Sequence, residues 1–245
     1  MKPMKTIFEN MVPKNEMQVR RTGGFTLIEL LVVIAIIGVL AALTVAGLGG
    51  IGKSKKISSA RADLEQIKAA LDDYYAKYHV YPPANQRPNS DYTPQNDRAQ
   101  FNQLYYELSG VTINGANFVT LDGTASIPIA SVNAAYGVAG FLNCSKGSGE
   151  DASPAISCLH KLVPAQYYYP VTNITVPTTI LVTSVGGPDD TYQPLKMSGV
   201  NPVRYVYPGV QNPGSYDLWV QLVISGKTNL VCNWSKNVLI NNPIP

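Results

Sequence analysis

Glu29 is the one charged residue in an apolar run that covers residues 25–48. An ionised carboxylate near the centre of a hydrocarbon layer costs about 2.5–3.5 kcal/mol, and such groups usually have a specific role. The carboxylate of Glu29 therefore needs a partner. The alternative is that Glu29 lies one helical turn from the end of the run and simply extends into water.

The remaining residues give little support for nucleophilic or acid–base catalysis. The two histidines, His79 and His160, belong to no nucleophile–base arrangement and no nucleophile elbow. Cys158 lies two residues before His160, but such a pair forms a catalytic dyad only when the fold aims both side chains together. We expect that the protein is not an enzyme and that it uses no cofactor.

Residues 47–52, Gly-Leu-Gly-Gly-Ile-Gly, fit the G-x-G-x-x-G pattern of dinucleotide-binding loops, and Asp72 lies near the position of the acidic ribose ligand. That pattern needs a short strand before it and a compact βαβ unit around it. Here a membrane-length apolar run precedes it. We therefore interpret these glycines as points where a helix can bend.

Composition and charge favour one globular domain attached to an apolar anchor. The chain of 245 residues is 45% hydrophobic and 14% charged. Of its 19 Lys/Arg and 16 Asp/Glu, five and two lie in residues 1–24, so the remainder holds 14 of each. Because the excess of basic residues is confined to the start, we expect no nucleic-acid partner.

The apolar run is long enough, as a helix, to cross about 30 Å of hydrocarbon at about 1.5 Å per residue. A secretory signal peptide would have a shorter apolar region of about 7–15 residues, followed by a small-residue cleavage site. Basic residues lie on both sides of the run, so charge counting does not orient it. We predict a transmembrane helix over residues 25–52.

Residues 20–30, Arg-Arg-Thr-Gly-Gly-Phe-Thr-Leu-Ile-Glu-Leu, resemble the processing signature of type IV prepilins and type II secretion pseudopilins. The resemblance implies that a prepilin peptidase cuts after Gly24 and methylates the new N-terminal residue, Phe25. It also implies that a leader of residues 1–24 stays in the cytoplasm, that the chain crosses the bacterial inner membrane once, and that its head lies outside. A glycine before the cut lets a protease reach the backbone easily.

Cleavage before Phe25 would create an α-amino group at the membrane end of the helix. The Glu29 carboxylate of an axially shifted neighbour would neutralise that group and set the stagger between subunits. The resemblance thus implies a filament of copies of this chain and other pilin-like subunits, built by a membrane platform and an ATPase. We expect a structural subunit of a type II secretion pseudopilus or type IV pilus-like filament. The alternative is a low-abundance tip or surface recognition pilin, for adhesion or DNA uptake, with the same anchor.

The helix is predicted to continue as an amphipathic helix over residues 53–81. Seven apolar residues recur at helical spacing: Ile57, Ala60, Leu64, Ile67, Leu71, Tyr74 and Tyr78. Charged residues between them predict a solvated face: Arg61, Asp63, Glu65, Lys68, Asp72 and Lys77. Tyr81-Pro82-Pro83 ends the helix, because proline cannot extend it. This end also resembles the helix end of major pseudopilins.

Residues 82–245 are predicted to form a globular α+β head, so that the whole chain has a pilin fold: a long N-terminal helix packed on a small C-terminal antiparallel sheet. Residues 82–100 are a polar, proline-rich loop, and residues 101–110 predict a short helix that stops at Gly110. Residues 122–178 show no clear period and are expected to be an elaborated loop insertion. Strands are expected near residues 117–121, 179–185, 203–207, 216–224 and 229–233.

Residues 203–234 resemble the C-terminal part of major pseudopilins more loosely, through Tyr216-Asp217-Leu218 and Asn233-Trp234. In that family, acidic residues after the Tyr-Asp-Leu strand bind calcium. Residues 219–233 contain no Asp or Glu here, so we carry no metal site over. Asp189 and Asp190 are a candidate substitute, but their place after Gly-Gly-Pro favours a turn.

The three cysteines cannot all pair within one chain. Outside the cytoplasm, a disulfide between Cys144 and Cys158 would close a small loop and stabilise the fold by roughly 3 kcal/mol. Cys158 with Cys232 is the other pairing. Three unpaired, buried thiols are the alternative to both.

Overall fold

One helix, α1 (Leu27–Tyr78), follows the predicted apolar run and amphipathic stripe without a break. The computed structural model describes residues 24–88, 98–146, 153–159, 169–171, 176, 178–185 and 199–241, with backbone alone for 44–51 and 169–171. The chain divides into two compact units, Met1–Leu48 and Gly49–Pro245. The α+β class is confirmed, and the pilin fold itself stays a prediction.

The described part of the first unit, residues 24–48, becomes helical at Leu27, and its apolar side chains up to residue 43 are exposed. Phe25, Leu27 and Leu43 are 75%, 82% and 66% exposed. No helix among the described residues combines the length and the apolar character needed to cross a membrane. The transmembrane role of residues 25–52 stays a prediction.

In the second unit, the predicted apolar stripe of α1 is confirmed. Its five central residues are buried: Ala60, Leu64, Ile67, Leu71 and Tyr74. Ile57 and Tyr78, at its two ends, are partly buried against the same core. The helix ends at Tyr78, three residues before the predicted end, because His79 adopts a left-handed backbone conformation with φ of 57°.

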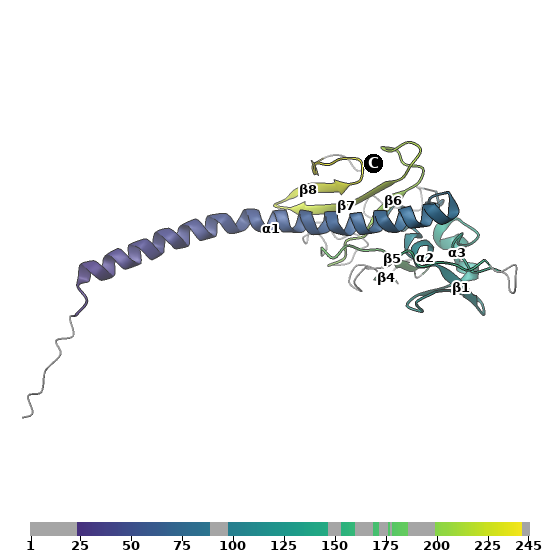
Figure 1. Ribbon diagram of the computed structural model, residues 1–245, viewed down its shortest axis with the longest axis horizontal. Coiled ribbons are helices and arrows are strands. Elements are labelled where there is room, and N and C mark those ends of the chain that lie inside the picture. The colour runs from purple at the N-terminus through teal and green to yellow at the C-terminus, as the bar shows by residue number, and fades with distance from the viewer. Residues whose placement is uncertain are drawn as a thin grey trace, which may run out of the picture. The chain divides into compact units, whose positions relative to one another are not determined.

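The C-terminal sheet has four antiparallel strands in the order β6 (Arg204–Val206), β7 (Asp217–Ile224), β8 (Lys227–Cys232) and β9 (Leu239–Ile240). Figure 1 shows β7 and β8 lying along the second half of α1. Alternate residues of β7, Leu218, Val220 and Leu222, belong to the main core with the α1 stripe. Trp219 faces the opposite way and packs with Leu230 in a second, smaller core. The three strands predicted in this region are confirmed.

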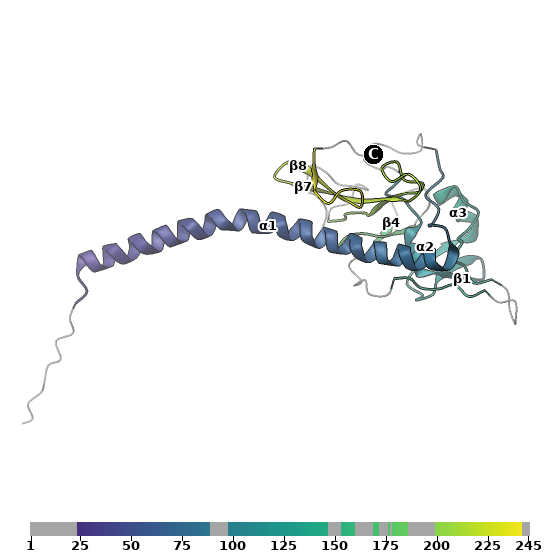
Figure 2. The same ribbon diagram turned by 45° about the horizontal axis from the view of Figure 1, so that its top comes forward.

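The rest of the head is made of short elements. The predicted short helix is α2 (Leu104–Ser109), which Gly110 follows with φ of 68°. A three-stranded antiparallel sheet has the order β1 (Val111–Asn114), β2 (Asn117–Thr120) and β3 (Ser126–Pro128), and β4 (Tyr169–Val171) pairs with β5 (Thr178–Ile180). In both views β1 lies on the side of α1 away from β7 and β8 (Figures 1 and 2).

The loop predicted over residues 122–178 is wrong for residues 126–136 and 169–171. Residues 169–171 form β4, and residues 126–136 form β3 and the helix α3 (Ile129–Tyr136), whose Val132 and Tyr136 are fully buried. The stretch shows no period because its contacts are aromatic and come from distant segments. For example, the Tyr136 ring of α3 packs edge-on against Tyr106, with ring centroids 6.3 Å apart.

The prediction that Asp63 lies on the solvated face of α1 is also wrong. It is 4% exposed, and its Oδ2 accepts hydrogen bonds from the backbone N–H of Ser184 at 2.8 Å and from the Ser184 hydroxyl at 2.7 Å. Arg61, Glu65 and Asp72 are exposed, as predicted. A carboxylate can be buried here because Ser184, 121 positions away, provides both of these donors.

Candidate assembly site on the N-terminal helix

The peptide bond between Gly24 and Phe25 lies in an exposed, non-helical segment just before α1. A peptidase needs an accessible backbone that is not held in a helix to bind a substrate. A Cβ atom added at Gly24 would meet no atom within 4 Å. The described residues therefore place no steric restriction on residue 24, and any requirement for glycine would come from a peptidase that binds this segment.

Thr26 and Glu29 form a capping box at the start of α1. Glu29 Oε2 accepts hydrogen bonds from the backbone N–H and the hydroxyl of Thr26, both at 2.8 Å. In return, the Glu29 N–H donates to Thr26 Oγ1 at 3.3 Å. These contacts satisfy N–H groups that the first turn of a helix leaves without partners.

The capping box uses one oxygen of the Glu29 carboxylate. Within the described part of the chain, no hydrogen bond is made to its Oε1. The carboxylate can therefore cap its own helix and still accept a hydrogen bond from a cation outside the chain. The sequence interpretation missed Thr26, although Thr-x-x-Glu before an apolar run is the usual sequence signature of a capping box.

Residues 19–45, which include this cap and the Gly24–Phe25 bond, match the model of the prokaryotic N-terminal methylation motif. The N-terminal segment is pilin-like. The chain is also 38% identical over 70 residues to the type II secretion system core protein G of Pseudomonas aeruginosa. That similarity covers 29% of this chain and 49% of the relative, so the chain spans about half the length of the protein it matches. No solved structure matches the chain.

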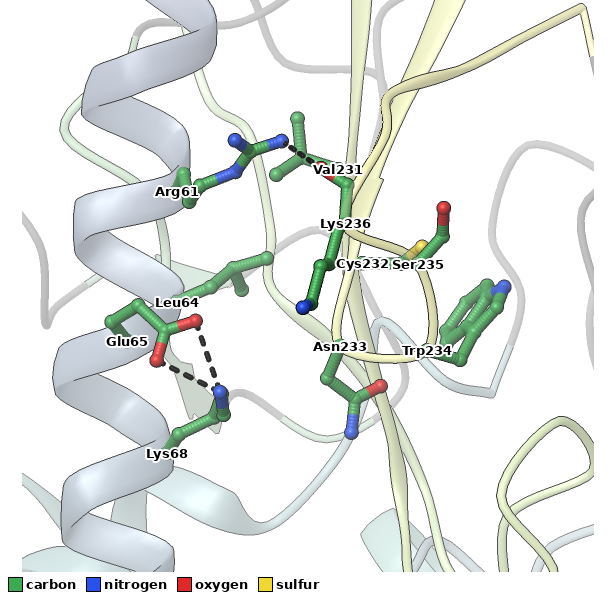
Figure 3. Close-up of a pocket in the computed structure, with 10 residues that line it drawn as sticks. All are labelled: Arg61, Leu64, Glu65, Lys68, Val231, Cys232, Asn233, Trp234, Ser235 and Lys236. Carbon is green, nitrogen blue, oxygen red and sulfur yellow. Dashed lines mark hydrogen bonds and ion pairs between the residues drawn. The ribbon is translucent and has the colours of Figure 1, made fainter.

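Beyond the pilin-like segment, a groove of about 570 Å³ lies between α1 and the end of β8. Figure 3 shows Arg61 reaching from α1 to the other wall, where its Nη2 donates to the Lys236 carbonyl at 2.8 Å. Lys68 and Glu65 pair along α1 at 2.8 Å. Since three cationic side chains line the groove against one carboxylate, it favours anionic groups.

The three cysteines are buried free thiols in the structure, so the disulfide considered between Cys144 and Cys158 is not formed. Both residues lie in the main core. Burial raises the pKa of the Cys158 thiol to about 11 and also raises the pKa of Cys144. Both thiols are therefore protonated, and weakly reactive, at neutral pH.

The other candidate residues do not form a site in the part of the chain that the structure describes. Asp189, Asp190 and His160 lie outside the described residues. Among the described residues, no three His, Cys, Asp or Glu side chains are grouped closely enough to hold a metal ion.

Proposed function

We propose that this protein is a structural subunit of a type II secretion pseudopilus or a type IV pilus-like filament. A prepilin peptidase cuts it after Gly24 and methylates Phe25. The mature chain then polymerises through α1. The observation that carries the proposal is the methylation motif at residues 19–45, with the Gly24–Phe25 bond exposed directly before the helix.

The apolar half of α1 supports this proposal. Residues 25–43 are exposed in the single chain, and they include large side chains such as Ile28, Leu31 and Ile37. So large an apolar surface needs a lipid environment or other protein surfaces to cover it. We propose that residues 25–52 anchor the unassembled subunit in the bacterial inner membrane and pack against shifted copies in the filament. A head-to-tail contact that does not close gives a helical filament.

The remaining partners follow from the same proposal. The leader of residues 1–24 faces the cytoplasm, and the head lies on the other side of the membrane. Other pilin-like subunits join the same filament. An inner-membrane platform and an ATPase act on the subunit indirectly, because a membrane helix has to be lifted out of lipid during assembly.

The processing step is tested by expressing the chain with a prepilin peptidase and measuring the intact mass of the product. We expect loss of residues 1–24 and addition of one methyl group to Phe25. Gly24→Ala should block both changes while leaving the fold intact, because the added Cβ meets no neighbour. A full-length wild-type product, or cleavage at another bond, would refute the proposal.

Glu29→Ala is expected to be cleaved and methylated normally but to lower the filament yield about tenfold or more. Loss of the carboxylate leaves the α-amino group of a neighbouring subunit without a counter-charge in an apolar environment. The measurement is the amount of filament sheared from cells, with the mass of the processed chain as a check. A normal yield of filament would contradict this role.

Two matched variants separate assembly from helix capping. Thr26→Val removes the hydroxyl of the capping box but keeps the charge of Glu29. Glu29→Gln keeps an oxygen that can cap but removes the charge. If the charge acts in assembly, Glu29→Gln should behave like Glu29→Ala, and Thr26→Val should assemble much better than either. The reverse order would assign the effect to the cap.

A further inference from the structure

An exposed section of α1 carries three lysines, Lys53, Lys55 and Lys56. All three are exposed, and within the described part of the chain they make no hydrogen bond or ion pair. Among the residues of the helix whose side chains the structure describes, Ala60 is the first that is fully buried. No Asp or Glu occurs between Glu29 and Asp63. The section therefore carries positive charge that the protein itself does not neutralise.

The lysines point to more than one side of the helix. Lys53 lies four residues before Ile57, and Lys56 lies four residues before Ala60, so both continue the line of the buried stripe. Lys55 lies about 160° from Lys53 around the helix, and Lys56 lies between them, so this collar of three side chains covers nearly half of the circumference. A lipid layer surrounds a helix and therefore meets all three side chains at once.

The position of the collar along the chain also fits a lipid headgroup layer. Lys53 follows the end of the apolar run at Leu48 by five residues, an advance of about 7 Å in a helix. The headgroup region adds roughly 5–7 Å to each side of the hydrocarbon core. Lysine side chains have flexible stems that let the ammonium groups reach phosphates at this depth.

We propose that Lys53, Lys55 and Lys56 form a collar that binds anionic phospholipid headgroups on the outer side of the membrane and so sets the depth of the unassembled subunit. This proposal rests on the proposed membrane anchoring of residues 25–52. These contacts oppose removal of the subunit from the membrane. They have to be released when the subunit enters a filament, which makes assembly sensitive to anionic lipid.

The test uses the full chain reconstituted into phosphatidylcholine bilayers. Traces of spin-labelled phosphatidylglycerol or phosphatidylcholine are added, and electron paramagnetic resonance measures the fraction of each that is immobilised against the helix. We expect phosphatidylglycerol to be preferred about fivefold, the factor for one lysine near an anionic surface. The preference should fall in 0.5 M salt, where charges are screened over about 4 Å.

Lys53→Gln, Lys55→Gln and Lys56→Gln together should abolish the preference, and the corresponding triple arginine variant should keep it. The matched control replaces three exposed lysines of the head, Lys146, Lys227 and Lys236, with glutamine, which gives the same change in net charge. This control should keep the preference. Loss of preference in both glutamine variants would indicate a general charge effect and would overturn the collar.

The outcomes separate this inference from the proposed function. Immobilised lipid without any preference for phosphatidylglycerol would overturn the collar and leave the anchor standing. No immobilised lipid at all would overturn both. If the glutamine variant of the collar kept the preference but formed few filaments, the lysines would act in contacts between subunits, and the lipid proposal would be wrong.

Discussion

Replacing Glu107 with alanine is expected to lower the free energy of unfolding by about 3–5 kcal/mol. Glu107 is fully buried, and its carboxylate accepts three hydrogen bonds. Tyr74 Oη and the Asn143 N–H donate to Oε2 at 2.9 Å and 3.0 Å, and the Leu142 N–H donates to Oε1 at 2.9 Å. Alanine would leave these three donors buried without an acceptor, and each such donor costs about 1–3 kcal/mol.

The measurement is urea unfolding of the full chain in detergent, followed by tyrosine fluorescence. Glu65→Ala is the matched control, because Glu65 is exposed and its pair with Lys68 lies on the surface. It should change the free energy of unfolding by about 1 kcal/mol or less. Equal effects of the two substitutions would show that the buried carboxylate does not connect α1, α2 and residues 142–143 as the contacts indicate.

The same carboxylate should make stability depend on pH. Burial raises the pKa of Glu107 above its ordinary value of 4.5, and its hydrogen bonds with Asn143, Leu142 and Tyr74 offset only part of that rise. The folded chain therefore keeps this proton to higher pH than the unfolded chain does. The stabilisation from proton binding is fully present below pH 4.5 and is lost as the pH rises through the raised pKa. Glu107→Gln should remove this part of the pH dependence.

Asp217→Ala is expected to lower the free energy of unfolding by about 3 kcal/mol or more. Asp217 is fully buried at the start of β7, and its carboxylate binds three successive backbone N–H groups. Val210 and Gln211 donate to Oδ2, both at 2.7 Å, and Asn212 donates to Oδ1 at 3.0 Å. The connection between β6 and β7 is thus folded around one side chain, and alanine would leave its N–H groups without acceptors.

Two further variants make this prediction specific. Asp217→Asn should have a smaller effect, because its carbonyl oxygen still accepts while its NH₂ group cannot. Gly209→Ala should destabilise the same connection sterically, since a Cβ there would lie 2.8 Å from Asp217 Oδ1. Asp72→Ala is the control, because Asp72 is exposed on α1. Thermal unfolding gives the comparison, and an Asp217→Ala chain as stable as Asp72→Ala would contradict the prediction.

The sequence by itself determined the elements whose signals are local. A period of 3.6 residues predicted the buried stripe from Ala60 to Tyr74, because neighbouring turns of one helix share one environment. Segments rich in Val, Ile, Thr and Tyr predicted β7 and β8, because such side chains favour strands wherever they occur in the chain. The methylation motif at residues 19–45 was also recognisable, because it consists of consecutive residues. The capping role of Thr26 was equally local, although the interpretation missed it.

Only the tertiary structure decided which charged residues are buried. Asp63 follows the pattern of a solvated helix face, yet Ser184, 121 residues away, makes it a buried acceptor. Glu107 is buried because Asn143 and Leu142 bring their N–H groups to it from more than 30 residues away. The helix α3 likewise depends on distant segments, because its two buried residues, Val132 and Tyr136, pack into the main core. Burial of a charge depends on donors that the fold assembles from distant segments, and no periodicity within one segment records where those donors will lie.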